Sequence, residues 1–173
     1  DGRYLVASLY GQNGIRIYRT SDYRLQAQDT DYCANSMWAE FDAQGRLVTS
    51  SYDGNIRLYD NRFKLLNKRQ APGGHRPYAV RFSPAGDKIA VGFEDSTPVN
   101  VLSGHNLRLL YSPDTQGVNN GNLATPAWSQ DGRWLYAGGT YWDGSSRPIL
   151  SFRQAGQGSY RAWSASSNTV MDI

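Results

Sequence analysis

Short stretches in which apolar and polar residues alternate recur along the whole chain. In Ile15-Arg16-Ile17-Tyr18 and in Ile56-Arg57-Leu58-Tyr59, an arginine stands between two apolar residues. Such alternation is typical of a half-buried β-strand, because successive side chains point to opposite faces. Tight-turn sequences such as Ser83-Pro84-Ala85-Gly86 and Asp53-Gly54 separate the stretches. No stretch with helical periodicity competes with this pattern, which therefore predicts an all-β fold.

A turn glycine followed by a strand returns at a nearly constant interval. These glycines are Gly2, Gly45, Gly86 and Gly132, and the intervals between them are 43, 41 and 46 residues. The alternating stretch keeps the same interval, and so does a short strand before each turn, at 39–41, 80–82 and 126–128. The last residues, 170–173, read as a further copy of that short strand. The chain is therefore a series of repeats, each made of four short strands.

One repeat carries a recognisable order of motifs. Gly74-His75 is followed by a strand at 78–82, the turn Ser83-Pro84-Ala85-Gly86 and a second strand at 88–92. This order resembles the WD-repeat family, whose units of about 40–45 residues each form one propeller blade. Tyr59-Asp60 resembles the Trp-Asp pair that ends such a unit, with tyrosine in place of tryptophan. The resemblance covers nearly the whole chain and implies β-propeller blades of four antiparallel strands.

The chain departs from the family pattern in ways that mark it as a divergent member, of the kind found in bacteria. No repeat contains Trp-Asp itself, and only the third has Gly-His at the expected place. The family's buried set of His, Ser/Thr, Asp and Trp is complete in none of the repeats. His75 and Asp95 come nearest to it, so the resemblance implies that they form a structural hydrogen-bonded pair.

The phase of the repeats suggests an incomplete ring. We expect a single WD-repeat-like region over 1–173, with a closing strand at 168–173 and repeats at about 1–29 (partial), 35–68, 76–112 and 122–163. The first repeat would lack its innermost strand. About four blades fit a four-bladed ring, half of an eight-bladed homodimer, or a piece of one larger propeller. Family members typically carry seven or eight blades, which favours the last two, and a start without methionine suggests a longer product.

Composition narrows the chemistry that the chain can perform. Of its 173 residues, 39% are apolar and 19% charged, and no apolar run reaches the roughly 20 residues of a membrane helix. One cysteine, Cys33, and two histidines leave little for a metal and exclude an internal disulfide. The net charge is +3 with the basic residues spread over all repeats. We expect no cofactor, no metal, no membrane and no nucleic-acid partner; the location stays open, with the cytoplasm favoured.

Aromatic and arginine residues gather in the loops expected on one face of the propeller. These residue types dominate protein-binding hot spots. The candidate protein-binding residues are Trp38, Tyr52, Arg76, Tyr78, Tyr141 and Trp142. For Tyr10, Tyr52 and Phe93 we also expect packing between blades, in place of the family's tryptophans.

The sequence contains no catalytic motif. Polar residues that a tunnel mouth would use are scattered and never stand at ligand spacing; they are Asp31, His75, Glu94, Asp95 and Asp143. We therefore expect a non-catalytic scaffold that binds a protein or peptide on its loop-bearing face. The alternative is a propeller enzyme or a small-molecule-binding propeller that uses polar residues at the tunnel mouth. A catalytic domain attached outside this chain would also be compatible with the sequence.

Overall fold

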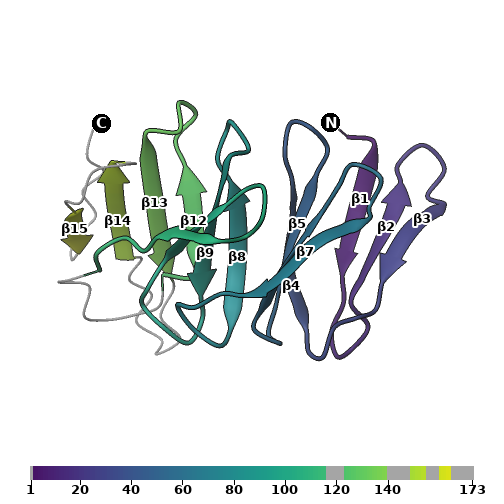
Figure 1. Cartoon of the computed structure of the whole chain (residues 1–173), viewed down its shortest axis with the longest axis horizontal. Helices are drawn as coiled ribbons and strands as arrows, with labels where there is room; N and C mark the ends of the chain where they lie inside the picture. Colours follow the sequence, from purple (N-terminus) through teal and green to yellow (C-terminus); the bar gives the residue numbers. More distant parts are fainter. Residues whose placement is uncertain (1, 116–122, 140–148, 155–159, 165–173) are drawn as a thin grey trace.

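The protein is built from short antiparallel strands. The computed structural model describes residues 2–115, 123–139, 149–154 and 160–164, and all regular elements in these ranges are strands. The strands form four separate sheets. Figure 1 shows the sheets standing side by side in a row, with β1–β3 at one end and β14–β15 at the other. The prediction of an all-β fold with four-stranded blades is confirmed.

The four sheets, here called the first to fourth blades, follow one another along the chain. The first blade contains β1 (Tyr4–Ser8), β2 (Ile15–Arg19) and β3 (Leu25–Asp29). The second contains β4 (Ser36–Phe41), β5 (Leu47–Ser51), β6 (Asn55–Tyr59) and β7 (Leu65–Gln70). The third contains β8 (Pro77–Phe82), β9 (Lys88–Phe93), β10 (Asn100–Ser103) and β11 (Leu109–Tyr111). The fourth contains β12 (Thr125–Trp128), β13 (Trp134–Gly139), β14 (Ile149–Gln154) and β15 (Tyr160–Ser164).

Within each blade, every strand pairs with the strand that follows it in the chain, so the blade is a meander. Tight turns make this possible, and the four turn glycines that set the repeat, Gly2, Gly45, Gly86 and Gly132, all have positive φ angles between 69° and 79°. β4 contacts β8, and β8 contacts β12. The first strands of the second, third and fourth blades therefore lie next to one another.

The hydrophobic core consists of three layers, each between two successive blades. The layer between the first and second blades contains Ile15, Ile17, Tyr32, Leu47 and Tyr59. A second layer joins the second and third blades around Val48, Leu58, Ile89 and Phe93. The third layer, around Ala90, Val101, Leu123 and Leu135, joins the third and fourth blades. Because side chains alternate along a strand, each middle blade contributes to two layers.

The expected closing strand at 168–173 lies outside the described residues. Among the residues that the structure describes, no helix is long and apolar enough to cross a membrane.

Candidate protein-binding face

Main-chain hydrogen bonds hold the loops of one face together. The Tyr52 N–H donates to the carbonyl of Asn35 (2.9 Å), and the Glu94 N–H donates to the carbonyl of Arg76 (3.0 Å). Each bond joins the loop that enters a first strand to the loop between the second and third strands of the same blade. We call the surface formed by loops 9–14, 30–35, 52–54, 71–76 and 94–99 the loop face.

Two of the predicted binding residues meet on the loop face, around a carboxylate. The Tyr52 hydroxyl donates a hydrogen bond to Glu94. The Arg76 guanidinium lies over the Tyr52 ring, with Cζ 4.4 Å from the ring centre, and its Nη2 is 3.1 Å from Glu94 Oε2. Burial and the neighbouring Glu94 carboxylate raise the pKa of Tyr52, so the hydroxyl keeps its proton. The Arg76 side chain is still 51% exposed, which leaves it able to contact a partner.

The other two described candidates form a second group on the first strands β4 and β8. The rings of Trp38 and Tyr78 lie 6.2 Å apart, centre to centre. Arg81 covers Trp38, with its Cζ 4.6 Å from the ring centre, and forms a 3.0 Å ion pair with Glu40. Burial raises the pKa of Glu40, while the Phe82 N–H and Arg81 oppose this shift. The group thus links the second and third blades along their first strands.

The pair His75 and Asp95 is connected through the main chain. The Asp95 carboxylate accepts hydrogen bonds from the backbone N–H groups of His75 (2.9 Å) and Arg76 (3.0 Å). Asp95 therefore fixes the loop that carries Arg76, and the bond to His75 uses its backbone N–H rather than its imidazole. The contact therefore differs from the side-chain pair that the resemblance implies. Two consecutive backbone amides of the loop donate to the Asp95 carboxylate instead.

The remaining sequence candidates lie in different surroundings. Tyr141 and Trp142 fall outside the described residues. Phe93 is fully buried in the layer between the second and third blades. Tyr10 is 73% exposed on the loop face, so it does not pack between blades as expected. Tyr52 is partly buried and combines packing with exposure.

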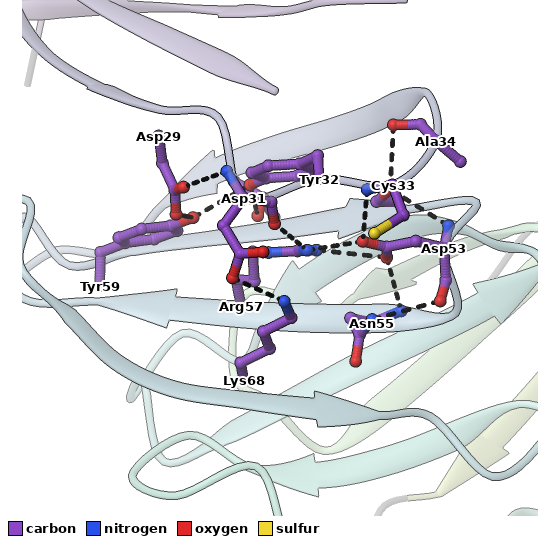
Figure 2. Close-up of polar contacts among 12 residues, drawn as sticks. Asp29, Asp31, Tyr32, Cys33, Ala34, Asp53, Asn55, Arg57, Tyr59 and Lys68 are labelled. Carbon is purple, nitrogen blue, oxygen red and sulfur yellow. Dashed lines mark hydrogen bonds and ion pairs between the residues drawn. The ribbon is translucent and has the colours of Figure 1, made fainter. Parts of the chain in front are cut away.

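A buried polar network between the first and second blades was not predicted from the sequence. The Tyr32 hydroxyl is 2.7 Å from Thr49 Oγ1 and 3.0 Å from the Tyr59 hydroxyl. The Tyr59 hydroxyl in turn donates to Asp29 (2.7 Å). Figure 2 shows Asp29, Tyr32 and Tyr59 converging from the end of β3, the following loop and β6. Burial raises the pKa of Tyr32 to about 12, although the bonds to Thr49 and Tyr59 oppose this shift. Burial also raises the pKa of Tyr59, so both hydroxyls stay protonated at neutral pH.

An ion pair completes this network. Arg57 is fully buried and lies 2.5 Å from the carboxylate of Asp53. It also donates to the carbonyl of Asp31. Burial disfavours the charged form of Asp53, but the bonds from Arg57 and from the Asn55 N–H outweigh it and lower its pKa to about 2. The network therefore joins the loop before β4 to the second blade and stabilises one side of the loop face.

Some signals for this network were present in the sequence. The stretch Ile56-Arg57-Leu58-Tyr59 places Arg57 and Tyr59 on the same face of one strand. Asp53 stands four residues before Arg57, in the turn that precedes this strand. The role of Tyr32 had no such signal, because it lies in the irregular loop between β3 and β4.

No group of three or more His, Cys, Asp or Glu side chains that could hold a metal ion occurs among the described residues.

Comparisons with known proteins agree with this architecture. Residues 24–60 match the family model described as WD domain, G-beta repeat. No curated protein sequence matches the chain. A chain in the crystal structure of the mitotic checkpoint complex is similar to 96% of this chain, with a TM-score of 0.80 and 19% sequence identity. The computationally designed Ika8 protein is similar to 94% of it, with a TM-score of 0.73 and 16% identity.

The chain covers 49% of the matched chain of the mitotic checkpoint complex and 46% of Ika8. It therefore spans about half the length of each. WD-repeat propellers are generally non-catalytic scaffolds for protein interactions. The matched residues include Asp29, Tyr32, Arg57 and Tyr59 of the buried network. The match of residues 24–60, the four antiparallel sheets and the likeness in fold together identify one WD repeat within a chain that folds as β-propeller blades.

Proposed function

We propose that this chain is a non-catalytic scaffold that binds a protein or peptide through its loop face. The observation that carries the proposal is the cluster of Tyr52, Arg76 and Glu94. It presents an aromatic ring and a half-exposed guanidinium that are already held in place by a carboxylate and by the loop bonded to Asp95. Preorganised groups of this kind lose little conformational entropy on binding.

Two further observations support a protein partner. Trp38 and Tyr78 are both partly exposed and belong to the residue types that dominate binding hot spots. One of the structures similar to this chain is part of the mitotic checkpoint complex, and scaffolding is the general role of the fold. The loop face provides the ring of Tyr52 for apolar contacts and Arg76 for a carboxylate or carbonyl of the bound segment.

Selection from a phage-displayed library of random peptides tests the proposal. Peptides that bind the immobilised chain would be synthesised, and their dissociation constants measured by fluorescence anisotropy. We expect Arg76→Ala to weaken binding by at least about tenfold, as for a hot-spot residue.

Arg62→Ala is the matched control. Arg62 is exposed in the turn between β6 and β7, outside the loop face, so its removal should change binding less than twofold by the usual size of remote effects. Selected peptides that bind Arg76→Ala as well as the unchanged protein would contradict the proposal. So would a library that yields no binder.

A further inference from the structure

Three aromatic side chains form a strip across the second and third blades, at the loop-face end of their first strands. The rings of Trp38 and Tyr78 lie 6.2 Å apart. Trp38 pairs with Ser50 in the sheet, and the Ser50 hydroxyl donates to the carbonyl of Tyr78. Tyr52 follows two residues after Ser50; besides burial and the Glu94 carboxylate, Tyr78 raises its pKa, so the two tyrosines lie near each other. We call Trp38, Tyr78 and Tyr52 the aromatic strip.

The aromatic strip belongs to the two middle blades of the described chain. The second and third blades each have four strands, and their first strands contact the blades on either side, β4 that of the first blade and β8 that of the fourth. All three rings of the strip are partly exposed. Neighbouring blades therefore hold the strip in place while its rings stay open to a partner.

The charges around the aromatic strip cancel in pairs. Arg76 is 3.1 Å from Glu94, and Arg81 is 3.0 Å from Glu40. Each carboxylate also has a second donor: Glu94 accepts from the strip itself, and Glu40 accepts from the Phe82 N–H at 2.6 Å. The surroundings of the strip thus carry no net charge, and their carboxylate acceptors are already engaged.

The polar groups that stay available on this surface are mainly donors. Within the part of the chain that the structure describes, neither the indole N–H of Trp38 nor the hydroxyl of Tyr78 has a hydrogen-bond partner. Arg76 is 51% exposed, and a guanidinium carries five N–H donors and no acceptor. A well-matched segment would therefore bring free carbonyls, few N–H groups and no charge.

The three regular backbone conformations differ in how far they meet this demand. An α-helix uses its carbonyls internally, and a β-strand brings one N–H per residue that needs an acceptor. Proline has a carbonyl but no N–H, and a polyproline II helix has no internal hydrogen bonds. Its rings also pack on aromatic side chains, and aromatic-lined grooves are a general means of binding such segments.

On the basis of the proposed function, we infer that the segment bound at the loop face is proline-rich and adopts the polyproline II conformation. Its prolines pack against Trp38 and Tyr78, and its carbonyls accept hydrogen bonds from the Tyr78 hydroxyl and from Arg76. This names the chemistry of the partner, which the loop cluster around Arg76 alone leaves open.

The peptides selected from a random phage-displayed library test the inference through their composition. We expect them to contain proline at least about twice as often as the unselected library. Replacement of these prolines by alanine should weaken binding by at least about tenfold, because packing and preorganisation are both lost. Tyr78→Phe keeps the ring against Trp38 and removes only the donor, so it should weaken binding about fivefold.

Tyr23→Phe is the matched control, because Tyr23 is 72% exposed in a turn of the first blade, away from the strip; it should leave the dissociation constant unchanged. In ¹H–¹⁵N spectra, the indole signal of Trp38, assigned by its absence in Trp38→Phe, should shift when a selected proline-rich peptide is added.

Two outcomes would overturn the inference and leave the proposed function standing. One is a set of binders that depend on Arg76 but carry no excess of proline. The other is a set of proline-rich binders that Tyr78→Phe affects no more than Tyr23→Phe. A library that yields no binder would overturn both.

Discussion

The guanidinium of Arg57 lies over the ring of Tyr32, with its Cζ 3.7 Å from the ring centre. Arg57 belongs to β6, whereas Tyr32 belongs to the loop that connects the first and second blades. A buried cation needs compensation for its lost hydration, and here the Tyr32 ring, the Asp53 carboxylate and the Asp31 carbonyl provide it together. This contact therefore couples the connecting loop to the blade that follows it.

Replacement of Arg57 should destabilise the protein strongly. Arg57→Met leaves the Asp53 carboxylate, 3% exposed, without its cation. Breaking a buried pair on one side costs about 3 kcal/mol or more. Urea denaturation should show this loss in the free energy of unfolding. The double change Asp53→Asn with Arg57→Met should recover part of it, because the unpaired charge is gone; a single Arg57→Met variant as stable as the unchanged protein would show that the pair contributes little.

The Tyr59 hydroxyl should contribute separately from the ring. Tyr59→Phe keeps the packing between the first two blades but removes the bonds to Tyr32 and Asp29. We expect a loss of about 1 to 2 kcal/mol in the free energy of unfolding, because polar partners remain buried. Tyr10→Phe removes a hydroxyl from a ring that is 73% exposed and should change stability by less than about 0.5 kcal/mol. Equal effects of the two changes would contradict the role of the network.

Acid should weaken the protein through Asp53. Its pKa falls from an ordinary value of 3.8 to about 2 in the folded state, so the unfolded chain binds a proton more readily. The stability that Asp53 provides is complete above its unfolded pKa and is lost as the pH falls through its folded pKa. The free energy of unfolding, measured by urea titration from pH 5 to about pH 2, should fall less steeply in Asp53→Asn. Parallel curves for the two proteins would assign the acid sensitivity to other carboxylates.

The strands and their repetition were predictable because they depend on local features. Alternation in Ile56-Arg57-Leu58-Tyr59 predicts the strand β6, and the turn at Gly45 predicts where β5 begins. The same alternation predicts a half-buried strand, but both faces of β6 are buried because a blade packs on each side. The layers between blades follow from the same alternation, since Leu47 and Val48 point to opposite neighbours. Local rules were therefore sufficient for the architecture.

The polar contacts were less predictable because they depend on distances between blades. Tyr52 and Arg76 were both candidates for the loop face, but their meeting at Glu94 depends on how two loops from different blades approach each other. Tyr32 reaches Thr49 and Tyr59 from a loop of irregular conformation. Such a loop has no periodicity that shows where its side chain points.

Substitution of Gly14 should destabilise the protein more than substitution of Gly45, one of the glycines that mark the repeats. Gly14 and Gly45 have φ angles of 65° and 79°, and an alanine at either position adopts an unfavourable left-handed conformation at a cost of about 1 kcal/mol. A Cβ at Gly14 would lie only 2.0 Å from the carbonyl oxygen of Asp29, whereas at Gly45 the nearest atom is 3.6 Å away. Relief of the Gly14 clash requires the main chain at the end of β3 to move, and this displaces Asp29 from Tyr59. In urea denaturation, Gly14→Ala should therefore lower the free energy of unfolding by about 1–3 kcal/mol more than Gly45→Ala does. Equal losses would mean that the loop before β4 adjusts without disturbing the buried network.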